Sequence, residues 1–131
     1  MEILFLVGRV FYGGYFVYSG INHFRFRKMM VPYIQSKNVP MAEFLNAVAG
    51  LLILLGGAGI LLGVYIEWSV LAIALFLIPV TVVMHDFWNA QDPTARMSLH
   101  QHFLKNMVML GAALMLLAIP APWPFALVQL I

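Results

Sequence analysis

Residues Phe44 to Leu62 read FLNAVAGLLILLGGAGILL, and this stretch decides the fold. It is close to the roughly 20 apolar residues that a helix needs to cross the hydrocarbon core of a bilayer. Asn46 is its most polar residue, and three of its glycines lie together at Gly56, Gly57 and Gly59. The stretch therefore predicts a membrane-spanning helix and, with it, an integral membrane protein.

The composition of the whole chain agrees with this prediction. Of the 131 residues, 63% are hydrophobic and 9% are charged, whereas an ordinary soluble domain carries about 25% charged residues. The net charge of +2 is too small to indicate a nucleic-acid-binding surface. The chain has no cysteine, which excludes disulfides, thiolate chemistry, iron–sulfur clusters and thiol-ligated zinc. The first residues lack a basic region and a cleavage site, so we expect a retained first helix, not a removable signal peptide.

Three more apolar stretches accompany the first, so we predict an all-α fold, an integral membrane four-helix bundle with short loops and a single domain over residues 1–131. The four predicted helices span about residues 3–22, 44–62, 68–84 and 102–119. The last helix stops before a series of prolines, which cannot continue a helix. Asp92-Pro93 has the form of a helix start, so this last helix is expected to begin early, with an interfacial turn before its membrane-spanning part. Beyond it, Trp123 and Phe125 are expected to anchor the chain at the membrane interface.

Basic residues set the predicted orientation. They are Arg25, Arg27, Lys28 and Lys37 in the first connection and Arg96 in the third, and the second connection has none. Because loops rich in Lys and Arg remain on the cytoplasmic side, we expect loops 1–2 and 3–4 in the cytoplasm and both termini outside. The expected location is the plasma membrane of a prokaryote, crossed several times.

Polar residues gather at the cytoplasmic ends of all four predicted helices. They are Asn22, His23, Glu43, Asn46, His85, Lys105 and Asn106. Polar groups at membrane depth must meet one another or face a wet cavity, so we predict that these side chains form one ligand-binding pocket. Glu43 and Lys105 are the expected ion pair, with separate snorkelling to the headgroups as the alternative.

Two polar stripes also carry glycines. At 100° per residue, one stripe holds Arg9, Gly13, Phe16, Gly20 and His23, and the other holds Glu43, Asn46, Gly50 and Gly57. Glycines let helix backbones approach closely within a membrane, so both stripes should face other helices. Arg9 is then expected to reach Glu67, Glu2 or a polar pocket, or else to snorkel outward. Arg9 and Glu67 are the predicted structural polar residues.

The histidines do not predict a metal site. His100 and His102 would point in different directions on a helix, and no Cys or carboxylate cluster supports the four histidines. His85 is followed by Asp86, Phe87 and Trp88. An imidazole that donates to a carbonyl oxygen, with aromatic rings beside it, suits a quinone head group, although interfacial anchoring explains the same residues.

Two parts of the chain resemble the DoxX family of small membrane proteins. Arg9-Val-Phe-Tyr-Gly13-Gly-Tyr-Phe16 and Gly20-Ile-Asn22-His23-Phe24 resemble its first helix, and His85-Asp86-Phe87-Trp88, His102-Phe103-Leu104-Lys105-Asn106 and Gly111 resemble its second half. The resemblance covers nearly the whole chain and implies a four-helix plan. It also implies a role like that of relatives described as membrane subunits of thiosulfate:quinone oxidoreductase or terminal quinol oxidase, or linked to oxidative stress. It supplies no agreed catalytic residues.

The leading hypothesis is a small subunit of a quinone-linked redox or oxidative-stress complex, with a quinone as candidate cofactor and catalysis by the chain itself left open. The expected partners are the lipid bilayer and either other membrane subunits or further copies of the chain, with no nucleic acid. One alternative is a non-catalytic scaffold or assembly partner that binds helices through its Gly-lined faces. A small transporter is the other, and the nearly apolar outer half of the helices disfavours it because it offers no continuous polar path.

Overall fold

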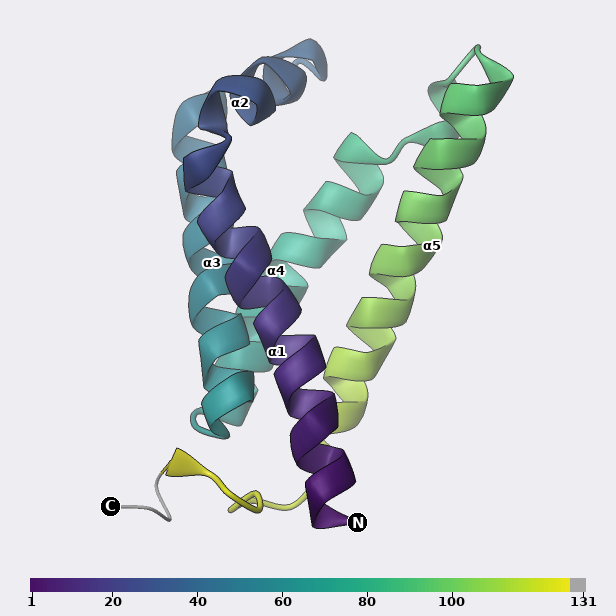
Figure 1. Ribbon diagram of the computed structural model, residues 1–131. Helices are drawn as coiled ribbons and strands as arrows, with labels where there is room; N and C mark the ends of the chain where they lie inside the picture. Colours follow the sequence, from purple (N-terminus) through teal and green to yellow (C-terminus); the bar gives the residue numbers. More distant parts are fainter. Residues whose placement is uncertain (128–131) are drawn as a thin grey trace.

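The computed structural model of the protein describes residues 1–127 and is helical throughout its regular structure (Figure 1). The elements are α1 (Glu2–Arg25), α2 (Arg27–Ser36), α3 (Ala42–Leu62), α4 (Ile66–Met84), the short 3-10 helix η1 (Phe87–Asn89) and α5 (Pro93–Leu116). The prediction of an all-α protein is confirmed for this part of the chain. The predicted number of four helices is wrong, because these residues form five α-helices.

The additional helix, α2, occupies the connection that was predicted as a loop. The backbone nitrogens of Met29 and Met30 both donate to the carbonyl oxygen of Phe26, which starts a new helix directly after α1. At its other end, Asn38 and Met41 have positive φ angles of 58° and 53° and redirect the chain into α3. The first end of α2 has no side-chain cap, so the usual sequence signal of a helix start is missing there.

The last helix begins early, as Asp92-Pro93 indicated. The carboxylate of Asp92 accepts a hydrogen bond from the backbone nitrogen of Ala95 at 2.8 Å, which caps the helix at Pro93. The helix then ends at Leu116, so it spans Pro93–Leu116 and not the predicted residues 102–119. The other predicted helices lie within α1, α3 and α4.

Glycines bring α1 and α3 into backbone contact. The buried residues of α1 are Arg9, Gly13, Phe16 and Gly20, as the predicted stripe requires. A Cβ atom on Gly13 would lie 2.7 Å from the carbonyl oxygen of Gly57, and one on Gly57 would lie 2.8 Å from that of Gly13. No other residue fits this contact, and the glycine stripes therefore pack against each other within one chain.

The four long helices pack in sequence order, with α1 along α3, α3 against α4, and α4 against α5, while α2 packs on α3. In Figure 1 the N-terminus and residues 117–127 lie at the bottom, and α2 and the first turns of α5 lie at the top. Trp123 in the bottom segment is fully buried and its ring meets that of Phe5 at 5.0 Å between centroids. The expected interfacial role of Trp123 is therefore wrong, because its ring completes the core.

Among the described residues, three segments are long and apolar enough to cross a membrane: α1, α3, and residues Ile66–Asn89, which include α4. Large apolar side chains are exposed on the outer faces of the helices, among them Phe11, Leu55 and Val108. In a bilayer these side chains would contact lipid. The helix α5 has a similar length, but its first half carries Arg96, His102 and Lys105. The chain is a membrane protein, and α5 is its most polar long helix.

Candidate ligand-binding pocket

A cavity of about 440 Å³ lies among all five α-helices, at the end where α2 folds over the others. This volume falls in the range of about 300–1,000 Å³ that is usual for small-molecule sites. The walls are mostly apolar, with Phe16, Leu52, Phe76 and Val80 among the lining residues. The cavity can therefore hold a largely hydrophobic molecule.

The structure brings most of the predicted site residues to this cavity. The predicted residues that line it are His23, Asn46, His85, Lys105 and Asn106. Four further residues with polar groups in the lining, Tyr15, Ser19, Tyr33 and His102, were not predicted as site residues. Their helical spacing was the available signal: Ser19 precedes His23 by one turn, and His102 precedes Lys105 and Asn106 on α5. The polar side chains share one cavity with apolar walls.

Asn46 is the most deeply buried polar residue of the pocket. Its side chain is 3% exposed, and its Nδ2 donates to the carbonyl oxygen of His23 at 2.8 Å. Its Oδ1 is buried and has no hydrogen-bond partner. An unpaired buried acceptor is unfavourable, so the contribution of this amide is its single bond to His23, which ties α3 to α1 beside the cavity.

His85 follows the last residue of α4 and also carries a buried polar atom without a partner, its Nδ1. Its ring stacks on that of His102, with 5.2 Å between centroids and 20° between planes. The Nζ of Lys105 lies 3.4 Å from Nδ1 of His102 and 5.9 Å from the centre of the Tyr15 ring. These contacts bring aromatic rings and a lysine ammonium group together at one side of the cavity.

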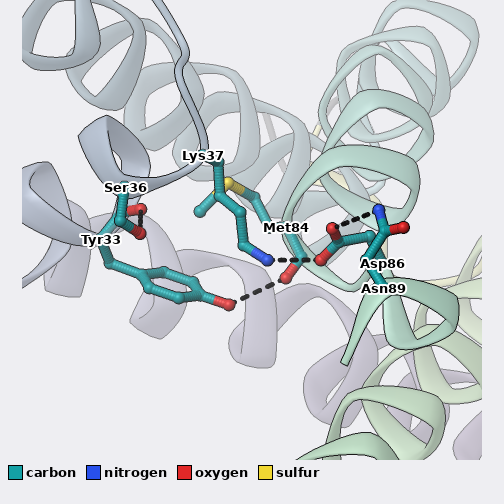
Figure 2. Close-up of polar contacts among 6 residues, drawn as sticks. All are labelled: Tyr33, Ser36, Lys37, Met84, Asp86 and Asn89. Carbon is teal, nitrogen blue, oxygen red and sulfur yellow. Dashed lines mark hydrogen bonds and ion pairs between the residues drawn. The ribbon is translucent and has the colours of Figure 1, made fainter. Parts of the chain in front are cut away.

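Two contacts join α2 to the end of α4 beside the cavity, and Figure 2 shows them together. The hydroxyl of Tyr33 donates to the carbonyl oxygen of Met84 at 2.9 Å, and Lys37 forms an ion pair with Asp86. Both side chains of the pair are partly shielded from solvent, with exposed fractions of 21% and 16%, and Asn89 adds a hydrogen bond to the other oxygen of Asp86. The pair of contacts holds α2 over the cavity.

Glu43 and Asn22 do not line the cavity. The carboxylate of Glu43 faces Arg27 at 3.5 Å, and both side chains are more than half exposed. The predicted pair of Glu43 with Lys105 is therefore wrong, because Glu43 lies in the first turn of α3 and turns outward toward α2. An exposed pair of this kind contributes little to stability.

Arg9 lies at the opposite end of the protein from the cavity. It is 2% exposed, and its guanidinium donates to the carbonyl oxygens of Ile60, Leu61 and Pro124 at 3.1, 2.8 and 2.6 Å. The rings of Phe5 and Trp123 flank it at 5.9 and 5.5 Å. The predicted inward direction is correct, but the partners are backbone oxygens, whereas Glu67 is exposed. Arg9 thus ties α1 to the end of α3 and to the C-terminal segment.

Within residues 1–127, no group of three or more His, Asp or Glu side chains is placed to hold a metal ion. The cavity lining includes hydrogen-bond donors and acceptors but neither Asp nor Glu. It suits recognition of a polar head group by hydrogen bonds.

One comparison with known proteins agrees with the family resemblance of the residues quoted for the first helix. The family model of DoxX matches residues 4–86, which includes α1 to α4 and ends beside His85. The resemblance seen in the sequence extended to Gly111, beyond the end of this match. No curated protein and no solved structure matches the chain. The family match covers more than half of the chain, and the protein belongs to the DoxX family.

Proposed function

We propose that this DoxX protein binds a quinone-like amphiphile in the cavity and serves as a small membrane subunit of a quinone-linked redox or oxidative-stress complex. One observation carries the proposal: an apolar cavity of about 440 Å³ among the helices is lined at one side by residues that carry hydrogen-bond donors, His85, Lys105 and Asn106. A quinone combines a hydrophobic body with acceptor oxygens, so it can accept hydrogen bonds from these donors while its body contacts the apolar walls.

The lining residues divide naturally between head and body of such a ligand. His85 and Asn106 would donate hydrogen bonds to the head, and Lys105 would stand beside it as a further donor. Phe16, Leu52, Phe76 and Val80 would contact the hydrophobic part. When bound, a quinone supplies redox chemistry that the side chains of this chain lack, and the protein's own part is to bind and orient it.

In a membrane, we place α1, α3, α4 and α5 as the four helices of a transmembrane bundle, with α2 at the interface. The basic residues near α2, among them Arg25, Arg27 and Lys28, then lie in the cytoplasm by the positive-inside rule. The cavity opens near that leaflet of a prokaryotic plasma membrane, where a lipid-soluble ligand is available. Partner subunits or further copies would bind the exposed apolar faces of the bundle.

The scaffold alternative has lost the faces on which it rested. Gly13, Gly20, Gly50 and Gly57 lie in the contact between α1 and α3, so a partner helix cannot use them. A scaffold would have to bind through other surfaces, and it would not explain why His85, Lys105 and Asn106 share one apolar cavity.

The direct test is to identify the small molecules that co-purify with the protein in mild detergent, by mass spectrometry of an organic extract. We expect a quinone above its level in the bulk membrane extract, and its loss from His85→Ala and Asn106→Leu. The lipid-facing variant Leu55→Ala is the matched control and should retain it. A native protein without enriched quinone would contradict the proposal.

A second test concerns the complex. In membranes with unchanged protein level, His85→Ala should lower quinone-dependent electron flow, because the head group loses one of its contacts. Unchanged flow would remove His85 from this role.

A further inference from the structure

We infer that the cavity binds an amphiphile whose head group is an anion, and that Lys105 is the cation that selects it. The chemistry shared by such ligands is a delocalised negative charge on oxygen, as in the carboxylate of a fatty acid or the ionised hydroxyl of a hydroxyquinone. The inference rests on the proposed function, since it concerns the same cavity, and it adds the charge of the ligand's head group.

The ammonium group of Lys105 lies at the cavity and is open to a ligand. Lys105 lines the cavity together with His102 and Tyr15. Its Nζ lies 3.4 Å from Nδ1 of His102, in an exposed contact, and 5.9 Å from the centre of the Tyr15 ring. Tyr15 belongs to α1 and Lys105 to α5, so the side chain extends toward a second helix that lines the same space.

No carboxylate of the described chain neutralises this charge. The ion pairs within residues 1–127 are Arg27–Glu43 and Lys37–Asp86, and Lys105 belongs to neither. The remaining acidic residues lie at or just before the starts of helices, and none of them lines the cavity: Glu2, Glu67 and Asp92. Lys105 is therefore a cation beside an apolar cavity that contains no anion of its own.

Lys105 also lies near the middle of its helix. With 1.5 Å per residue, it is about 18 Å from the first residue of α5 and about 16 Å from the last. In the membrane placement proposed above, its ammonium group lies within the hydrocarbon region, where a charged group is unfavourable unless it is paired or contacts water. The anion of a bound ligand would provide the pairing, and the attraction would exceed that in water because the effective dielectric constant is lower.

The neighbours of Lys105 offer further donors to an anion. An ammonium group can only donate, so Nδ1 of His102 accepts from it and the imidazole proton lies on Nε2. Asn106 is 5% exposed and lines the same cavity, and its amide nitrogen carries two hydrogens. A neutral ketone oxygen can also accept these hydrogen bonds, but it cannot neutralise the ammonium group. Charge is therefore the property by which the cavity distinguishes the two kinds of head group.

The test measures dissociation constants of the purified protein in a non-ionic detergent at about pH 8, where carboxyl groups, with an ordinary pKa of about 4, are ionised. Two pairs of ligands are compared: dodecanoate with methyl dodecanoate, and a decyl hydroxynaphthoquinone with its methyl ether. The hydroxyl of this naphthoquinone is conjugated to a carbonyl group and ionises like a carboxylic acid. Because charged and neutral forms enter micelles to different extents, the partition of each ligand is measured and the constants refer to free ligand.

We expect the native protein to bind the anion of each pair about tenfold more tightly, which corresponds to about 1.4 kcal/mol. In Lys105→Met the ratio should fall to about one, because the side chain keeps a similar length but loses its charge. Lys105→Arg keeps a positive charge and should retain the preference. Lys28→Met makes the same change at an exposed lysine of α2 that does not line the cavity, and it should leave the ratio unchanged.

The outcomes separate this inference from the proposed function. Equal affinities within both pairs, or an anion preference that persists in Lys105→Met, would overturn the inference while leaving quinone binding intact. A preference for dodecanoate without binding of either naphthoquinone would support the inference and overturn the quinone function, whereas a preference within the naphthoquinone pair would support both. Binding of none of the four molecules would overturn both. The comparison within each pair uses the native protein, so it decides the matter even if Lys105→Met does not fold.

Discussion

The hydroxyl of Tyr12 in α1 donates a hydrogen bond to the backbone carbonyl oxygen of Met109 in α5, with 2.6 Å between the oxygens. Because α5 packs mainly against α4, this bond is a direct polar link between the first and the last helix. Met109 also lines the cavity. The position of α5 beside the cavity therefore depends in part on one tyrosine in α1.

Tyr12→Phe should lower the free energy of unfolding in detergent by about 1 kcal/mol, the usual net contribution of one hydrogen bond. The ring of Tyr12 packs against Phe16, and phenylalanine keeps that contact. Tyr18→Phe is the matched control, since Tyr18 is exposed and its change should leave stability unaltered. Equal stability of both variants would mean that the link to α5 contributes nothing.

Gly57→Ala should destabilise the contact between α1 and α3. The added methyl group would lie 2.8 Å from the carbonyl oxygen of Gly13 and from the Cβ of Phe16, so the two helices must move apart. Overpacking of this kind costs about 1–3 kcal/mol. Gly14→Ala adds a methyl group with nothing within 4 Å and should be neutral or stabilising. Thermal unfolding of the two variants, followed by circular dichroism, measures the difference, and a Gly57 variant as stable as the native protein would contradict the close contact.

Arg9→Met should release the C-terminal segment. The substitution removes the three hydrogen bonds to Ile60, Leu61 and Pro124. A hydrogen bond from a charged donor contributes about 1.5–3 kcal/mol to stability. We expect faster proteolysis within the segment that follows Ile119, and a lower unfolding temperature. Glu67→Gln should change neither, although the sequence suggested Glu67 as the partner of Arg9. A destabilised Glu67 variant would restore that earlier interpretation.

Exchanging the charges of Lys37 and Asp86 tests the link between α2 and α4. Lys37→Asp and Asp86→Lys each place like charges together, so hydrogen exchange of the α2 backbone amides should become faster in both single variants. The double variant recreates an ion pair in reverse and should recover most of the protection. The coupling energy should be about 1 kcal/mol, because the pair is only partly shielded from solvent. Additive effects of the two changes would show that the pair does not hold α2.

The sequence predicted the parts of the fold that depend on polar or small residues in apolar helices. Asn46, His85 and Asn106 stand out because nothing around them can solvate them, and the structure places all three on one cavity. The glycines of α1 and α3 indicated close helix contact for a similar reason. The amides and the imidazole are too unfavourable on a lipid-facing surface to be placed there. Glycine is not, since Gly14 has open space around it, so the glycines were informative only where they shared a stripe with polar residues.

Features that depend on the backbone were not predictable in the same way. The helix α2 begins with backbone bonds to the carbonyl oxygen of Phe26 and has no side-chain cap at its start, so no residue pattern predicted where it begins. A weak signal remained in the spacing of Met30, Tyr33 and Ile34, which face the cavity together. Arg9 bonds backbone oxygens, which any residue could supply, so the sequence wrongly favoured an acidic partner.

The most direct test of the cavity as a binding site is photolabelling with a benzoquinone that carries a diazirine in its hydrophobic tail. The account predicts labels on the apolar lining residues Met30, Leu52, Val80 and Met109, and their loss when unlabelled decyl benzoquinol is in excess. Labels confined to the exposed residues Phe11, Leu55 and Val108, undiminished by the competitor, would contradict it.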